Sequence, residues 1–201
     1  MGDILDADTD IVVGFTDTFD TDITDDVVIN GASLQGQLLR RTYESNRSRL
    51  DEELARALSE YLPTTVETRA AKPKGKLERY SIGTIAVIGS PRRRIYCVAY
   101  SKMGNDLVAR SSLDDLWISL GQLWATISAR GQLSNVTIPI MGAELARVHS
   151  LDRENLLKVI ILSFIARSRL QPMCRQLSVL IRQEDADKVD MLEMKAFLAA
   201  L

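Results

Sequence analysis

Apolar residues along this chain fall into two kinds of pattern. Short runs rich in β-branched residues, each too short for a helix, predict buried strands. Longer segments in which apolar residues recur every three or four positions predict amphipathic helices. The predicted strands cover residues 11–13, 80–88, 94–101, 136–141 and 177–181, and the predicted helices start near Ser33, Ser48, Ser111 or Ser112, Ser150 and Asp187. Because strands and helices alternate, we predict a three-layer α/β/α fold with a central mixed sheet.

The ends of these helices can also be predicted. Ser33 is expected to cap the first helix, and Pro63 ends the second. Gly131 suits the position just after the third helix. Trp117 and Trp124 lie one heptad apart on that helix, and we expect both in the core. The inward residues expected of the last helix are Val189, Leu192, Ala196 and Phe197.

Composition limits the class of protein. The chain has 201 residues, of which 46% are apolar and 26% charged, so we expect one folded domain spanning residues 1–201. A net charge of −2 gives no overall basic field for nucleic acid. The N-terminus is acidic, unlike a secretory signal, and the longest apolar run, residues 156–165, is too short to span a bilayer. Cys97 and Cys174 are read as free thiols in a reducing compartment.

Two charged segments have both a simple and a functional interpretation. Residues 64–79 are basic and lack a clear period, so we expect an exposed loop connecting to a hairpin of the strands 80–88 and 94–101. The alternative is a phosphate or nucleic-acid patch, although no aromatic residues alternate with the charges. Residues 16–26 are rich in Asp and Thr and predict a solvated loop. They lack the glycine and terminal glutamate of a calcium-binding EF-hand loop, so we predict no metal site.

Two loops at strand ends are candidate ligand sites. Residues 14–18 follow the first strand, where ligands of open α/β sheets bind, and small or hydroxylated residues there can present N–H groups to a phosphate. Most such loops, however, bind nothing. Residues 142–149 lie between a strand and a helix N-terminus, an arrangement that favours anions. Gly36, in the first turn of its helix, indicates close approach either by a ligand or by another backbone segment. His149 has no accompanying nucleophile motif, so we predict no catalytic residue.

These loops, together with the opening turn, resemble the motifs of macro domains, the ADP-ribose-binding fold. Macro domains typically carry GDIT followed after a short gap by DAIVNAAN, and later a strand ending in proline followed by a glycine-rich loop. The matching segments here are Gly2-Asp3-Ile4-Leu5, Asp10-Ile11-Val12-Val13-Gly14-Phe15-Thr16-Asp17 and Ile138-Pro139-Ile140-Met141-Gly142-Ala143-Glu144-Leu145. The amino-acid sequence of these segments is most similar to that of the macro domain of Thoeris anti-phage effector proteins.

The resemblance implies roles for individual residues. Asp3 would accept a hydrogen bond from the adenine amino group, and the Ile4 backbone N–H would face a ring nitrogen. The distal ribose would be surrounded by Gly14, Phe15, Thr16, Asp17 and Thr18 with Gln35, Gly36 and Gln37. The pyrophosphate would be held by Gly142, Ala143, Glu144, Leu145, Ala146 and Arg147. A distal amino group would meet Asp17, Asp20 or Glu144, and a carboxylate would meet Arg147 or Lys102, which lies with Met103 in a loop after the strand 94–101.

Departures from the family pattern bear on activity. Hydrolytic macro domains carry an asparagine where this chain has Asp17, followed by a run of glycines of which only Gly36 remains. The resemblance therefore implies a binding module rather than an enzyme. It would sense an ADP-ribose-derived signal, such as a histidine conjugate made from NAD by a TIR-domain enzyme. The alternatives are an ADP-ribosylhydrolase in which Asp17 activates water, and an α/β domain with no nucleotide ligand.

The same resemblance implies the cellular setting. The partner is a small nucleotide signal with no separate cofactor, and no nucleic acid is involved. The domain would be cytoplasmic, with any tether to the inner membrane formed by a segment outside this chain. The resemblance also leaves a homo-oligomer possible, because ligand binding would shift an equilibrium of assembly or of membrane association.

Overall fold

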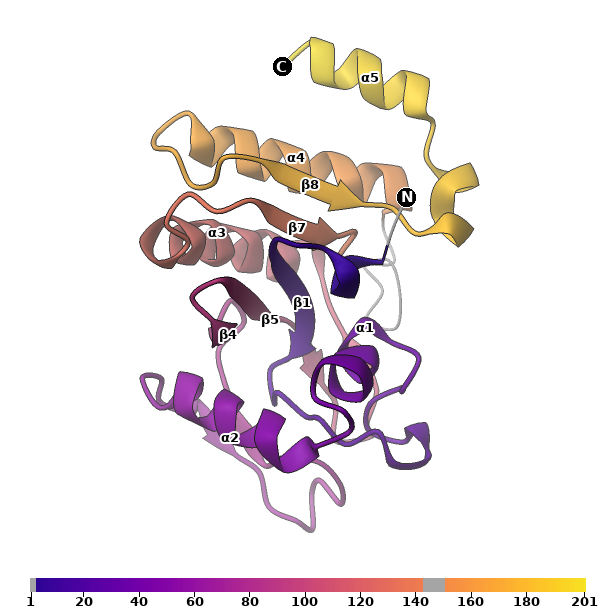
Figure 1. Ribbon diagram of the computed structural model, residues 1–201. Coiled ribbons are helices and arrows are strands. Elements are labelled where there is room, and N and C mark those ends of the chain that lie inside the picture. The colour runs from indigo at the N-terminus through magenta and orange to yellow at the C-terminus, as the bar shows by residue number, and fades with distance from the viewer. Residues whose placement is uncertain (1–2, 143–150) are drawn as a thin grey trace.

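A mixed sheet forms the middle layer of the computed structural model, which describes residues 3–142 and 151–201 (Figure 1). Its strands, in spatial order, are β4 (Ile85–Ser90), β5 (Arg93–Met103), β1 (Asp10–Thr16), β7 (Val136–Pro139) and β8 (Leu177–Leu180). Neighbouring strands from β5 to β8 are parallel, whereas β4 runs antiparallel to β5. The short strand β6 (Ala109–Arg110) adds to the end of β5. The predicted mixed sheet and the hairpin are confirmed.

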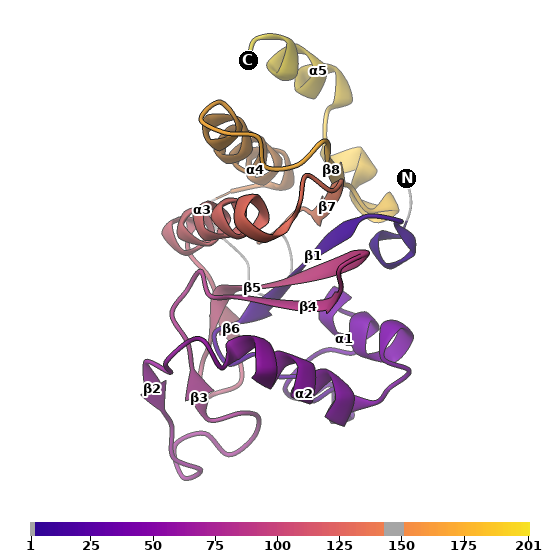
Figure 2. The same ribbon diagram turned by 60° about the vertical axis from the view of Figure 1, so that its left-hand side comes forward.

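Helices cover both faces of this sheet (Figure 2). One face packs against α3 (Leu113–Arg130) and α4 (Arg153–Ser168), and the other against α1 (Leu34–Gln37), a π-helical turn (Leu38–Thr42) and α2 (Arg47–Leu58). Val12 belongs to the first core and Val13 to the second, as expected for a strand whose successive side chains point to opposite faces. The three-layer α/β/α arrangement is therefore confirmed.

Several predicted boundaries need correction. β1 continues through Gly14, Phe15 and Thr16, which we had expected in a loop, because these residues keep pairing with β5. Lys102 and Met103 are also strand residues, because they extend β5 and pair with β6. β4 begins only at Ile85 and β7 already ends at Pro139.

The helix caps follow ordinary chemistry but not always at the expected residue. Ser33 caps α1, and Ser112 forms a reciprocal capping box with Asp115 at the start of α3. Asn46 caps α2 and Asp152 caps α4, each two residues from the predicted Ser48 and Ser150. Of these, Ser150 lies outside the described residues.

Two helices expose apolar residues that we had expected inside. Trp124 is buried, but Trp117 is 52% exposed. On the last helix, α5 (Met191–Ala199), Leu192 is 80% exposed and Met194 is the buried residue.

The glycine after α3 also differs from the prediction. Gly131 is not in the left-handed conformation, since its φ is −80°, and the left-handed residues are Gln132 and Leu133.

The basic segment 64–79 is not simply an exposed loop. It contains a short hairpin of β2 (Thr65–Val66) and β3 (Glu78–Arg79), and the side chain of Lys72 is completely buried. Two further short helical turns are η1 (Ile4–Asp6) and η2 (Thr24–Asp26), and η4 (Gln183–Lys188) precedes α5. Within the described part of the chain, no helix has the length and apolar character needed to cross a membrane.

Candidate ligand-binding pocket

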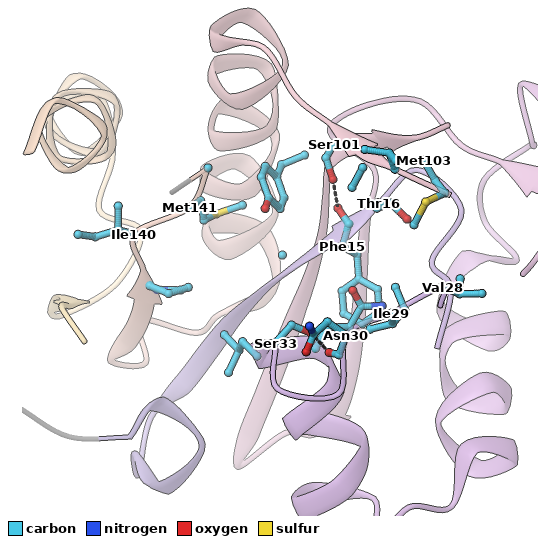
Figure 3. A pocket seen from close by; sticks show the side chains of 18 of the residues that line it. Phe15, Thr16, Val28, Ile29, Asn30, Ser33, Ser101, Met103, Ile140 and Met141 are labelled. Carbon is cyan, nitrogen blue, oxygen red and sulfur yellow. Dashed lines mark hydrogen bonds between the residues drawn. The ribbon is translucent and has the colours of Figure 1, made fainter. Parts of the chain in front are cut away.

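A cavity of about 390 Å³ opens at the carboxyl ends of the parallel strands (Figure 3). This is the position where ligands bind in open α/β sheets, and the volume lies in the range of small-molecule sites. One side is formed by β1 and β5, the second by the turn before α1, and the third by the ends of β7 and β8. Its lining includes Phe15 and Thr16, Val28, Ile29, Asn30 and Ser33, Ser101 and Met103, and Ile140 and Met141.

The floor of the cavity is apolar, and its Phe15 ring packs against aromatic rings behind it. The ring of Phe15 stacks on Phe19 with centroids 5.6 Å apart, and Tyr80 meets Phe19 edge-on at 5.8 Å. Val28, Ile29 and Met103 form a separate small cluster at the far side. Such surfaces suit the rings of a base or the carbon face of a sugar.

A few polar groups edge this floor, and internal hydrogen bonds orient them. The Ser33 hydroxyl donates to the Asn30 carbonyl at 2.6 Å and accepts from the Gly36 N–H at 3.1 Å. The Ser101 hydroxyl reaches the Phe15 carbonyl at 3.4 Å. An apolar cavity with a small number of fixed polar groups is the composition of a specific small-molecule site.

Charged residues lie at two places on the rim. Asp26, in a left-handed conformation with φ of 54°, accepts a hydrogen bond from the Gly31 N–H at 2.6 Å. Asp185 forms ion pairs with Arg153 at 2.5 Å and Lys188 at 3.0 Å. Burial raises the pKa of the Asp185 carboxyl, but the hydrogen bonds from these two cations outweigh it and leave that pKa below its usual value. Because Arg182 also lines the cavity, the rim has charges of both signs.

The opening turn borders the cavity through one residue. Ile4 lines it, whereas Asp3 caps η1 by accepting from the Leu5 N–H at 2.9 Å and forms an ion pair with Arg41. Burial by itself raises the pKa of Asp3, but hydrogen bonds from Arg41 and Leu5 together lower it, and the charge of Arg182 adds to this effect. The adenine-binding role of Asp3 stays a prediction.

The end of β1 is arranged differently from our expectation. The Asp17 carboxylate is buried and accepts from the Arg79 guanidinium at 2.8 Å and from the Met103 N–H at 2.7 Å. The Thr18 hydroxyl donates to Asp20 at 2.7 Å. Neither Asp17 nor Thr18 is on the cavity lining. An Asp17 carboxylate with both oxygens occupied is poorly placed to activate water.

Three other predicted ligand residues also lie away from the lining. A Cβ on Gly36 would come within 2.6 Å of the Asn30 carbonyl oxygen and the Gly31 Cα, so tight backbone packing accounts for this glycine. The Gln37 amide donates to the Ala32 carbonyl at 2.9 Å. Lys102 is 62% exposed and lies 3.4 Å from Asp115.

The lining thus contains part of the predicted set. The predicted residues that line the cavity are Ile4, Gly14, Phe15, Thr16, Gln35, Met103 and Gly142. The predicted residues that the structure places away from the lining are Asp3, Asp17, Thr18, Gly36, Gln37 and Lys102. The residues Gly2, Ala143, Glu144, Leu145, Ala146, Arg147 and His149 lie outside the described residues.

Sequence reasoning missed three parts of the wall. Residues 26–30 carry a usable signal, an apolar run followed by the turn dipeptide Asn30-Gly31. Residues 107–109, Arg182 and Asp185 carry no local pattern that would have identified them. Across residues 3–142 and 151–201, no group of three or more His, Cys, Asp or Glu side chains is placed to hold a metal ion.

Comparison with known proteins adds independent findings. A family model for the macro domain of Thoeris protein ThsA matches residues 1–182. Thoeris protein ThsA of Bacillus amyloliquefaciens (strain Y2) is 24% identical over 191 residues, which cover 92% of this chain but only 61% of that relative. A solved structure of a mutant Oceanobacillus iheyensis macrodomain shares the fold, with a TM-score of 0.54 at 13% identity over 100% of this chain and 91% of that one.

Proposed function

This chain belongs to the family of ThsA macro domains, and from that premise we propose that it is the ligand-sensing domain of a Thoeris-type anti-phage effector. Its ligand would be a nucleotide derived from ADP-ribose. The observation that carries this proposal is the cavity of about 390 Å³ at the carboxyl ends of β1, β5, β7 and β8, which is lined by residues of all three macro-like motifs.

The chemistry of the lining supports a nucleotide of this kind. Ile4 offers an apolar surface for the base at one end, and Arg182 supplies positive charge nearby. Thr16, Asn30 and Ser33 offer hydroxyl and amide groups that match sugar hydroxyls. Gly142 has a φ of 82°, a conformation that L side chains rarely adopt, which suits a tight turn beside a phosphate group.

In the proposed pathway a TIR-domain enzyme makes the signal from NAD, for example as a histidine conjugate of ADP-ribose, and this domain detects it in the cytoplasm. Binding would change the assembly of the full-length effector, which we take to be a homo-oligomer joined to the inner membrane by another segment. A ligand can shift such an equilibrium only by its difference in affinity for the two states. The domain itself would not turn the ligand over.

Calorimetric titration with ADP-ribose, its histidine conjugate and NAD tests this proposal. We expect one of the first two to bind with micromolar affinity, corresponding to roughly −8 kcal/mol, and to be recovered chemically unchanged. Failure of all three to bind would contradict the proposal, and hydrolysis of the ligand would favour the macro-type ADP-ribosylhydrolase instead.

A matched pair of variants locates the binding. Val108 lines the cavity and is 48% exposed, so Val108→Trp adds bulk at the rim with little disturbance of the core. Val66, on β2, is 63% exposed and outside the lining, which makes Val66→Trp the control. Only Val108→Trp should weaken binding. Equal affinity of the two variants would argue that the ligand binds elsewhere.

A further inference from the structure

Two cations of the basic segment 64–79 point into the protein rather than into solvent. The Arg79 side chain is 15% exposed and the Lys72 side chain is fully buried. Neither residue is on the cavity lining. Each one forms an ion pair with a carboxylate that follows β1, in the stretch between the strand and the turn before α1. These pairs are therefore located directly behind the cavity wall.

Arg79 connects three segments through its planar guanidinium. It donates to Asp17 at 2.8 Å, to Glu67 at 2.7 Å and to Asn105 at 2.8 Å. The second oxygen of Asp17 accepts from the Met103 N–H at 2.7 Å, and Met103 lines the cavity. Because the donors of arginine have a fixed geometry, this arrangement sets the position of the end of β5 relative to β1.

Lys72 has the equivalent role for the part of the wall that contains Gln35. Its ammonium group lies 2.9 Å from an Asp20 oxygen, and that carboxylate also accepts from the Thr18 hydroxyl and the Lys76 N–H. The backbone carbonyl of Asp20 accepts from the side-chain amide of Gln35, a lining residue. A chain of contacts thus runs from the buried ammonium to the cavity.

We propose that Arg79 and Lys72 are positioning residues, which fix two walls of the pocket through Asp17 and Asp20 without touching the ligand. Removing either cation leaves a buried carboxylate without its counter-charge, and the wall must move to hydrate it. Asp17 therefore serves the wall here, although the macro-domain pattern places a ligand contact at its position. This inference rests on the proposed function for the effect on affinity, but not for the effect on the wall.

The first test compares Arg79→Met with Lys74→Met. Lys74 lies in the same segment and is exposed, so it controls for the loss of one charge. Binding of ADP-ribose and of AMP is measured for each, because AMP lacks the distal ribose that would reach the Met103 wall. We expect Arg79→Met to weaken ADP-ribose binding about tenfold and AMP binding less than about twofold. Equal loss for both ligands would indicate a merely structural role and overturn the proposal.

A second test needs no ligand. Amide hydrogen exchange over residues 103–108 should become faster in Arg79→Met but stay at the wild-type rate in Lys74→Met. Arg79→Lys keeps the charge but not the planar donor geometry of the guanidinium, so its exchange rate should be intermediate. This variant replaces Arg79→Met if Arg79→Met does not fold. Unchanged exchange in both Arg79 variants would refute the positioning role. Wild-type protein that binds none of ADP-ribose, its histidine conjugate and NAD would instead refute the proposed function, and the exchange result would still decide the role of Arg79.

Discussion

Two aspartates, each next in sequence to a residue of the cavity lining, carry the same chemistry in different surroundings. At the opening turn, the Asp3 side chain is 38% exposed and pairs with Arg41, which is 39% exposed. At the end of β1, the Asp17 side chain is 8% exposed and pairs with Arg79, which is 15% exposed. Both aspartates match ligand positions of the macro-domain motifs, yet only the first is substantially exposed to solvent.

This difference separates a carboxylate that can exchange partners from one that cannot. An exposed ion pair contributes little to stability, so Asp3 can release Arg41 for a ligand at small cost. A buried pair that loses one member leaves an uncompensated charge, so the inner end behaves as part of the framework. The inner end, which is the buried pair of Asp17 and Arg79 with the neighbouring pair of Asp20 and Lys72, should therefore control stability. The outer end, which is the exposed pair of Asp3 and Arg41, should control recognition.

The largest effect is expected from Lys72→Met at the inner end. The variant keeps the length and apolar stem of the side chain but leaves the fully buried Asp20 without its cation. We expect a loss of about 3–5 kcal/mol in the free energy of unfolding, measured by urea denaturation. The exposed control Lys74→Met should change it by less than about 0.5 kcal/mol. A loss as small as that of the control would show that Asp20 is hydrated or protonated.

Gly36→Ala probes the packing of the same inner wall with a smaller expected effect. The added methyl group would come within 2.6 Å of the backbone at Asn30 and Gly31, so we expect a loss of about 1–3 kcal/mol. Gly121→Ala is the control, because a Cβ at Gly121 meets no atom within 4 Å and alanine favours the helix by about 0.5–1 kcal/mol. Urea unfolding should move in opposite directions for the two variants, and a shared direction would argue against tight packing at Gly36.

The layered fold could be predicted because the local periodicity of apolar residues indicates its helices and strands. Leu50, Leu54 and Leu58 recur at helical spacing and are all buried. Spacing tells which residues share a face, but not whether that face is covered, so it failed for Trp117 and Leu192. The same limit explains why strand ends such as Thr16 were misplaced, since their pairing depends on β5, a partner far along the chain.

The candidate site was predicted only in part. Gly14 and Gly142 were found because ligands gather at strand ends and because the macro-like motifs cover them. The ion pairs behind the wall join residues 52 and 62 positions apart, and no local pattern connects Lys72 with Asp20 or Arg79 with Asp17. A basic segment looks alike in sequence whether its cations face solvent or a buried carboxylate.

At the outer end, Asp3→Ala should separate recognition from stability. Because the ion pair is exposed, the free energy of unfolding should change by less than about 1 kcal/mol. Loss of the acceptor for the adenine amino group should weaken ADP-ribose binding by about tenfold or more. Asp8→Ala, a nearby exposed aspartate, is the control in both measurements. Unchanged ADP-ribose affinity in Asp3→Ala would contradict the assignment of the opening turn to adenine.

The smallest effect is the pH dependence of the Asp3 contribution. Burial raises the pKa of this carboxyl, but the hydrogen bonds from Arg41 and the Leu5 N–H lower it to a value below the 3.8 of an unperturbed group. Since the folded-state pKa is the lower one, ionised Asp3 stabilises the fold. That contribution is complete above the unfolded-state pKa and disappears as the pH falls through the folded-state pKa.

Comparison of wild-type protein with Asp3→Asn from pH 7 downward can detect this change. The difference in their free energies of unfolding should stay constant at neutral and mildly acidic pH, and should shrink once the pH falls below 3.8. Asp8→Asn measured in parallel corrects for the general effect of removing an acidic group. If the Asp3 difference kept its full size well below that pH, the side chain would be acting through its shape at the η1 cap, and the outer end would resemble the inner one in being structural.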